Sequence, residues 1–412
     1  MILPQRAVAS RSEMLRMVSA LLGARMGATA ISSLWFVIAA RELSIGDFAD
    51  LALLLSLALI FGVFADLGYP LLLSGVVAQD PSIARSACSR VVAKRLPIAV
   101  GAAIAFVAAF AVSGTASPVV AMILSLSLIA TAVHSSAAAT LRGLRSVAFE
   151  ATNEIGSRLF VLLIGTASLI GGGGLFAAVV VYAAADVLSA GFLILTVLRR
   201  TKRCAAADPA LFTLRRAMPL AAASILASVY SRIDLWLLAV LGSPTAVAGY
   251  AASFRVFEAL ALPASAVGGA SISTLAHLDQ RALRRRAAKL LGAASMLALP
   301  AAAMVGVAAR PVLVGLFGAA YGDQVPVLRV LLLGLLPTLL IGTLGPWVTF
   351  ERSGGVTAAI LGMLVVNVGL NLLFIPPHAG LGAAVATVVT QTFLALVVGA
   401  LGWAVTKRGD GA

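Results

Sequence analysis

The sequence predicts an all-α polytopic membrane protein of about twelve transmembrane helices, arranged as two parallel six-helix lobes around a central cavity. Of its 412 residues, 61% are hydrophobic and only 11% are charged, whereas about 25% of the residues of a soluble domain are charged. The apolar residues form long unbroken runs, as helices in a bilayer require, and do not alternate as the strands of a membrane barrel do. Six such runs lie on each side of a basic central loop.

Each predicted span holds about 20 predominantly apolar residues, the length of helix that crosses the hydrocarbon core. The spans lie near 17–40, 47–69, 93–113, 117–139, 147–170, 175–198, 217–241, 247–275, 289–309, 328–349, 355–375 and 380–405. The first run is too long for a cleaved signal peptide, so we expect it to stay in the membrane. No loop between spans is long enough for a soluble catalytic domain.

Lys and Arg residues concentrate in alternate loops. The loop before the third span carries Arg85, Arg90, Lys94 and Arg95, and further basic groups occupy 199–216 and 281–289. This positive-inside bias predicts that both termini lie in the cytoplasm. Anionic lipid headgroups satisfy such loops, so the net charge of +14 does not call for a nucleic-acid partner.

Cysteine and histidine usage points to no cofactor. Cys88 and Cys204 both lie in predicted cytoplasmic loops, where disulfides are rare. Two isolated thiols and three scattered histidines predict no metal site.

The two halves of the chain resemble each other weakly. Leu34-Trp35 in the first half matches Leu235-Trp236 in the second, and Gly174-Leu175 matches Gly380-Leu381. Because each half has an even number of spans, the repeats are parallel. We therefore predict lobes at 1–200 and 217–412 joined by a basic linker at 201–216, which is the architecture of a monomeric transporter.

Charged residues inside the predicted spans are costly, at about 2.5–3.5 kcal/mol each at the bilayer centre. We therefore expect them to face the cavity or to pair with one another. They are Arg25, Asp66, Glu150, Glu154, Arg158, Asp186, Arg232, Asp234, Arg255 and Glu258.

The spacing of these charges predicts which of them share a helix face. Glu150, Glu154 and Arg158 recur every four residues, and Arg255 and Glu258 are three apart. Both groups are either structural ion pairs or ligands of a substrate.

Other charges have simpler predicted surroundings. Arg232 and Asp234 are two apart, which predicts that they point to different sides of one span. Asp66 and Glu150 lie near span ends, where they would reach water.

Arg25 differs from the others because no acid lies within four residues of it on its own span. It is the best single candidate for holding an anionic ligand, and the alternative is a pair with an acid on another span.

Several stretches together resemble the bacterial polysaccharide flippases of the multidrug/oligosaccharidyl-lipid/polysaccharide exporter superfamily. They are 40–48 with Asp66-Leu67-Gly68, Ile233-Asp234 with Gly249-Tyr250, Leu316-Phe317-Gly318, and Asn367 to Asn371 followed by Gly380-Leu381-Gly382. The resemblance covers nearly the whole chain, and its order and spacing are more specific than any one motif.

This resemblance implies that the chain moves an oligosaccharide repeat unit, linked to undecaprenyl pyrophosphate, from the inner to the outer leaflet by alternating access. It implies that cavity arginines meet the pyrophosphate and sugars. By position these are Arg25, Arg158, Arg232 and Arg255, with Asn367 and Gln391 also lining the lumen. The implied partners are membrane lipids and the polysaccharide polymerase or export machinery.

Two alternatives stay open. The first is a cation-coupled multidrug or metabolite antiporter of the same superfamily, in which Asp186 or Asp234 would bind the coupling ion. The second is a membrane polysaccharide polymerase. Its active site would have to lie on the external stretch 310–327, which offers few catalytic groups, so we expect no enzyme.

Overall fold

The computed structural model describes residues 11–113, 118–202, 206–275, 280–351 and 353–407. Arg203 and Cys204 lie outside these residues. The described chain contains helices and no strand, which confirms the predicted fold class. The α-helices are α1 (Arg11–Glu42), α2 (Ile45–Asp66), α3 (Tyr69–Gln79), α4 (Ala84–Val112), α5 (Pro118–Gly143), α6 (Val147–Phe160), α7 (Thr166–Ile170), α8 (Gly174–Arg200), α9 (Leu214–Tyr230), α10 (Ile233–Leu241), α11 (Pro244–Leu275), α12 (Gln280–Val307), α13 (Ala309–Phe317), α14 (Val325–Leu333), α15 (Leu335–Glu351) and α16 (Ser353–Lys407).

Shorter elements connect them. They are 3-10 turns at η1 (Pro81–Ile83), η3 (Pro209–Phe212) and η4 (Ala319–Gln324), and a π-helical turn at η2 (Val161–Gly165) between α6 and α7.

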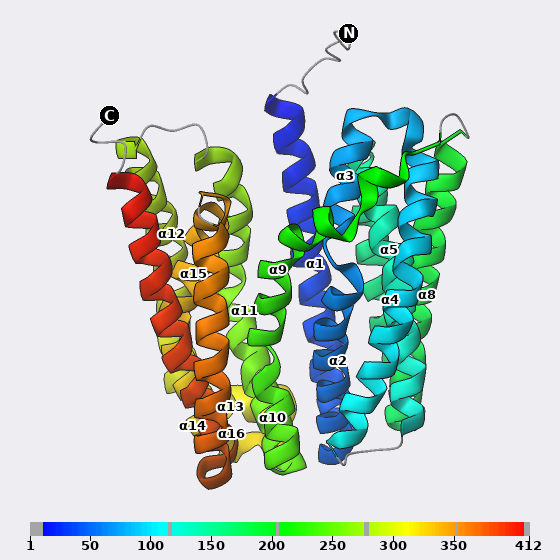
Figure 1. The fold of residues 1–412 in the computed structure, drawn as a ribbon. Helices are drawn as coiled ribbons and strands as arrows, with labels where there is room; N and C mark the ends of the chain where they lie inside the picture. Colours follow the sequence, from blue (N-terminus) through cyan, green and yellow to red (C-terminus); the bar gives the residue numbers. More distant parts are fainter. Residues whose placement is uncertain (1–10, 114–117, 203–205, 276–279, 352, 408–412) are drawn as a thin grey trace.

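The helices form two groups that stand side by side in Figure 1. In the first half of the chain, α5 packs against α4 and α8, and α1 packs against α6. In the second half, α15 packs against α11 and α16. Contacts between the groups come mainly from α1 and α2 with α9 and α11. We call the end at which α1 begins and α16 ends the terminal end, and the other the opposite end.

The helices have the length and composition of membrane spans. Within the described residues, nine are long and apolar enough to cross a bilayer, and a tenth is added if the bent pair η4–α14 and α15 counts as one. One of the nine runs from Gly354 to Ala404, and the non-helical backbone of Ala379 divides it. The count of about twelve therefore remains a prediction. The large apolar side chains of Met296 and Val307 are 83% and 84% exposed, as lipid-facing residues are.

Two of the predicted basic loops, those at 85–95 and 281–289, are largely helical in the structure. The third predicted span begins near residue 93, but α4 begins at Ala84, and α3 precedes it. Likewise α12 begins at Gln280, nine residues before the predicted span. Apolar runs locate only the part of a helix inside hydrocarbon, and these helices continue past it with Lys and Arg on their ends.

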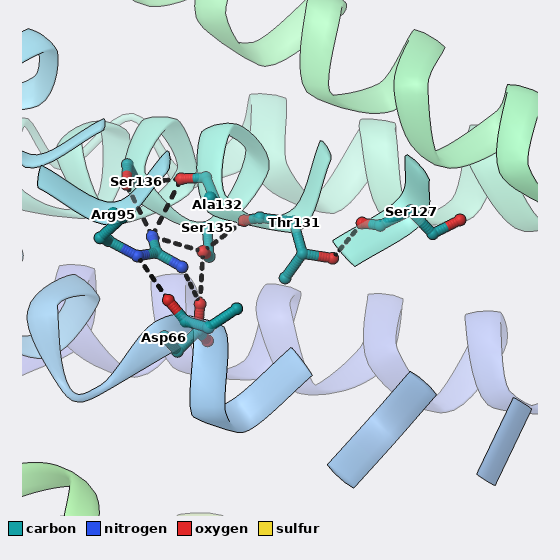
Figure 2. Close-up of polar contacts among 8 residues, drawn as sticks. Asp66, Arg95, Ser127, Thr131, Ala132, Ser135 and Ser136 are labelled. Carbon is teal, nitrogen blue, oxygen red and sulfur yellow. Dashed lines mark hydrogen bonds and ion pairs between the residues drawn. The ribbon is translucent and has the colours of Figure 1, made fainter. Parts of the chain in front are cut away.

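Arg95 was expected in a loop, and this expectation is wrong. Its side chain is fully buried, and it forms an ion pair with Asp66 (Figure 2). It also donates hydrogen bonds to Ala65 O at 3.1 Å, Ala132 O at 2.9 Å, Ser135 Oγ at 2.9 Å and Ser136 Oγ at 2.7 Å. One guanidinium thus joins α4 to α2 and α5.

Asp66 was expected to reach water near the end of its span, and the structure confirms this in part. It lies at the end of α2 and keeps 32% of its side chain exposed, while it also accepts from Arg95 and Ser135.

The stretch Asp66-Leu67-Gly68 closes α2 and starts α3. Leu67 and Gly68 both have left-handed backbone, with φ of 42° and 73°. A Cβ on Gly68 would lie 2.3 Å from the carbonyl oxygen of Ala217 in α9. Only glycine allows this approach between the first helical group and the start of the second.

The two groups are joined by side chains at the opposite end. Arg41 donates to the carbonyl oxygens of Leu316, at 2.7 Å, and Gly315 at the end of α13. The rings of Phe48 and Tyr321 meet edge to face at 5.9 Å. Trp236 Nε1 donates to Ala109 O at 3.2 Å. The groups are therefore closed against each other at this end.

Candidate functional site

A cavity of about 380 Å³ lies between the two helical groups. Residues of α1, α2, α5, α6 and α8 line one side of it, and residues of α10 and α11 with the α9–α10 junction line the other. The charged residues in its wall are Glu154, Arg158, Asp186, Arg232, Asp234, Arg255 and Glu258. The spans thus place these costly charges around a shared polar space.

Arg158 is the basic group of the first side. Its Nη2 lies 3.9 Å from Asp186 Oδ1, and its guanidinium carbon lies 5.2 Å from the centre of the Tyr182 ring. The Nη1 atom of Arg158 is buried and has no hydrogen-bond partner. A buried donor without an acceptor costs about 1–3 kcal/mol, so an anion reaching this atom would gain that free energy.

Arg232 and Arg255 share one acid on the second side. Arg232 Nη2 lies 2.5 Å from Glu258 Oε1, and Arg255 Nη1 lies 3.2 Å from Glu258 Oε2. Arg255 also lies 4.3 Å above the ring of Phe36 in α1. Two guanidinium groups therefore share one carboxylate in the wall that faces the first helical group.

Arg232 and Asp234 both line this cavity, so the expectation that they point to different sides is wrong. That expectation treated 217–241 as one continuous helix. In the structure α9 ends at Tyr230 and α10 begins at Ile233, so helical spacing does not apply across the junction.

Asp234 begins a polar network that runs into the second group. It accepts hydrogen bonds from the hydroxyl of Tyr250 and, at 3.1 Å, from Thr387 Oγ1. One turn further along α16, Thr390 accepts from Tyr230 Oη and from Asn367 Nδ2, each at 3.1 Å. The network links the cavity wall to the packing of α9, α11 and α16.

Taken together, three arginines face four acids in this wall. The acids are not distributed evenly, because Glu258 serves two arginines while Asp186 contacts Arg158 only loosely. The site therefore offers separate cationic points in a wall that holds one more acid than arginines. In the described residues no group of three or more His, Cys, Asp or Glu side chains is placed to hold a metal ion.

Of the predicted site residues, Arg158, Asp186, Arg232, Asp234 and Arg255 line the cavity. Asn367 and Gln391 do not. Asn367 is 1% exposed and bonded to Thr390, and Gln391 Oε1 accepts from Thr338 Oγ1 at 3.2 Å. They face neighbouring helices of their own group.

Arg25 also lies outside the lining, but it is on the same face of α1 as Thr29, Ser32 and Phe36, which do line it. It is one turn nearer the terminal end. Its side chain is 61% exposed, and its Nη2 lies 3.7 Å from Glu150 Oε1. Arg25 thus stands beside the cavity at the terminal end, loosely paired with an acid on another helix.

Sequence reasoning missed Tyr182, Tyr250 and His134 as cavity residues. A signal existed for Tyr182, which precedes Asp186 by four residues and so shares its face of α8. Nothing in the spacing indicated His134, because its neighbours on α5 are apolar or hydroxylic.

A charged cavity between two groups of helices of membrane-spanning length is typical of membrane transporters. The structure superposes on an inward-facing multidrug resistance MATE family transporter of the MOP superfamily, with a TM-score of 0.74, 15% identity, and coverage of 94% of this chain and 96% of that one. It is similar to the inward closed conformation of the lipid II flippase MurJ, with a TM-score of 0.73, 14% identity, and coverage of 91% and 85%. It is also similar to a MOP superfamily transporter from Pyrococcus furiosus, with a TM-score of 0.64, 15% identity, and coverage of 98% and 99%.

The family follows from sequence. Residues 14–278 match the family of polysaccharide biosynthesis proteins, and this match covers more than half of the chain. The chain therefore belongs to that family, on a fold shared with MOP transporters. No curated protein matches it by sequence.

Proposed function

We propose that this protein is a flippase that moves an oligosaccharide repeat unit linked to undecaprenyl pyrophosphate across the bacterial inner membrane. The observation that carries the proposal is the cavity between the helical groups, where Arg158 presents a buried donor without a partner and Arg232 and Arg255 share one acid. Membership of a polysaccharide biosynthesis family supports the choice of cargo.

The cavity addresses the physical barrier to this transport. A pyrophosphate with several sugars loses its hydration in hydrocarbon, and each polar group left unpaired there costs several kcal/mol. Guanidinium groups bind phosphate oxygens through charge-assisted hydrogen bonds. Hydroxyl and carboxylate groups such as Ser32, Ser189 and Glu154 in the same wall replace water around the sugars.

Alternating access follows from how the groups meet. The contacts of Arg41, Phe48 and Trp236 close the opposite end in this structure. With the termini in the cytoplasm, this state would receive cargo from the inner leaflet. Breaking these contacts and closing the terminal end would present the cargo to the outer leaflet.

The test is to delete the gene, extract the lipids, and measure both undecaprenyl-linked oligosaccharide and surface polysaccharide. We expect lipid-linked repeat units to accumulate on the inner leaflet and surface polymer to disappear, and the mass of the accumulated lipid identifies the sugars. Accumulation of precursor already on the outer leaflet would contradict the flippase and indicate a polymerase. Unchanged glycolipid and polymer would also reject it.

A second candidate is a cation-coupled antiporter, and the acids of the cavity favour it. Asp234 is 3% exposed and hydrogen-bonded to two hydroxyl groups. Asp186 lines the first side of the cavity. In the deletion strain, unchanged polysaccharide with raised sensitivity to a toxic cation would select this function.

We further propose that residues 1–200 and 217–412 move as two lobes of a monomer with both termini in the cytoplasm. Exposed positions test this orientation. Ser243→Cys, at the opposite end, should react with a membrane-impermeant maleimide added to intact cells. Arg215→Cys, near the start of α9, should react only after lysis, and the reverse pattern would overturn the orientation.

A further inference from the structure

A second hollow lies on the outer face of the first helical group, between α6 and α8. Its volume is about 330 Å³. Its walls include Gly156 of α6 and Leu188 and Phe192 of α8, and these residues are exposed on the surface that faces lipid. A Cβ on Gly156 would meet no atom within 4 Å, so this glycine leaves open space in the wall.

This groove adjoins the charged cavity. Ser157 and Ser189 line both hollows. The wall that separates them is shared, and in it Asn153 Nδ2 donates to Ser189 Oγ at 2.7 Å across the α6–α8 contact. Arg158, with its unpaired donor, follows Ser157 directly in the sequence.

The groove lies near the middle of the membrane. Gly156 is nine residues from the start of α6, and Leu188 is fourteen from the start of α8, which places both about 14–21 Å along spans of roughly 36–40 Å at 1.5 Å per residue. Lipid headgroups do not reach this depth. A hydrocarbon chain is the part of a lipid that fits here.

The depth also distinguishes between lipids. A membrane phospholipid keeps its headgroup at the surface and would offer only distant chain carbons. A lipid whose anionic head is held by Arg158 inside the cavity must instead pass the first carbons of its chain out at mid-depth, where the α6–α8 wall adjoins Arg158. The π turn η2 also directly follows Phe160 of the groove, and such turns are frequent at functional sites.

We propose that the groove between α6 and α8, lined by Thr152, Gly156, Phe160, Leu188 and Phe192, binds the polyisoprenoid chain of the lipid-linked cargo while the head occupies the cavity. This rests on the proposed function. It places the chain within one lobe, so that the chain can stay bound while the two lobes move apart and together.

The test uses full-length protein in liposomes and undecaprenyl phosphate that carries a photoreactive diazirine in its first isoprene units. After irradiation, we expect mass spectrometry to find labelled peptides from 152–160 and 185–192. Gly156→Leu should lower this labelling about tenfold, the effect of displacing roughly two buried methylene groups. Leu188→Trp, a second way to fill the groove, should lower it similarly.

Gly101→Leu on α4 is the matched control. Gly101 is also an exposed helical glycine, and a Cβ there would meet no atom within 4 Å. It lies outside the groove, so labelling should equal that of the wild type. Equal labelling of the groove by a diazirine phosphatidylglycerol would overturn the proposal in favour of bulk lipid. Labelling between α1 and α11 instead would overturn it in favour of a path between the lobes.

Flipping of lipid-linked oligosaccharide by the same liposomes separates the two proposals. Wild-type flipping together with unimpaired flipping and labelling in Gly156→Leu rejects the groove and leaves the flippase standing. If the wild type does not flip the cargo, the flippase is rejected. The groove proposal is then decided separately, by comparing the labelling from the undecaprenyl phosphate probe with the labelling from the phosphatidylglycerol probe.

Discussion

Arg95 and Arg158 belong to the same helical group, and both lie in helices long and apolar enough to cross a membrane, but their surroundings differ. Arg95 is 0% exposed, pairs with Asp66, and donates to four further oxygens. Arg158 lies 3.9 Å from its acid, and one of its terminal nitrogens is buried without a partner. Every nitrogen of the first guanidinium has a hydrogen-bond partner, whereas one terminal nitrogen of the second has none.

This difference gives a criterion for separating structural from substrate-binding arginines in a membrane cavity. Charges inside the bilayer are expensive in either case, so their presence alone does not identify a binding site. The number of satisfied donors does. By this criterion Arg232 and Arg255, which share Glu258, are intermediate.

The largest expected effect comes from Arg95→Met. This change leaves Asp66 without its cation, and breaking a buried pair in this way costs about 3–5 kcal/mol. We expect little folded protein in a detergent extract and a much lower melting temperature of what remains. The double variant Arg95→Met with Asp66→Leu removes both charges and should recover most of the lost stability. A single variant as stable as the wild type would show that the cluster of Figure 2 is not structural.

Arg158→Ala should have the reverse profile. Because its ion pair is loose, we expect the melting temperature to change little, while flipping by reconstituted protein falls by about 10–100-fold, the value of a charge-assisted hydrogen bond of roughly 1.5–3 kcal/mol. Arg158→Lys keeps the charge but loses the planar fork, so its flipping should lie between. Loss of stability without loss of flipping per folded molecule would place Arg158 with Arg95.

A smaller effect is expected from Glu258→Gln, which frees the two arginines that share this acid. One fewer negative charge beside an anion is worth about 1 kcal/mol at 4 Å in water, so inorganic pyrophosphate should bind roughly fivefold more tightly by calorimetry. The matched control is Glu150→Gln, since Glu150 pairs with Arg142 and Arg25 outside the cavity lining. Equal gains in both variants would indicate a general effect of net charge.

The fold was predictable because hydrophobic run length is a direct physical requirement of the bilayer. The repeat of the two halves stays a prediction. The structure shows only that Gly174 begins α8 and that Gly380 directly follows the break at Ala379 within α16. Arg95 was misplaced because span prediction assigns an arginine beside an apolar run to water. Its burial depends on α2, α4 and α5 meeting at Asp66, which no single stretch of sequence encodes.

The cavity was partly predictable for the same reason. Arg158, Arg232 and Arg255 were found because a charge inside a span must face something polar. Asn367 was expected beside them, yet it bonds to Thr390 within its own group, since an amide can be satisfied by one neighbouring helix. Relative rotation of helices decides between these outcomes, and periodicity does not specify it.

The smallest effect is expected from Arg25→Ala. This variant tests whether an exposed arginine beside the cavity contributes less to transport than Arg158, which lies inside the protein. Arg25 is 61% exposed at the terminal end, beside the cavity and 3.7 Å from Glu150, so water and salt screen its charge. We expect flipping to fall about twofold at low salt, as for an exposed charge worth roughly 0.5 kcal/mol, and to match the wild type at high salt. Arg158→Ala should remain impaired at both salt concentrations, because its guanidinium lies inside the protein. A salt-independent loss in Arg25→Ala as large as that in Arg158→Ala would mean that Arg25 enters the cavity during the cycle, and that donor satisfaction in one state does not identify the residues that hold the cargo.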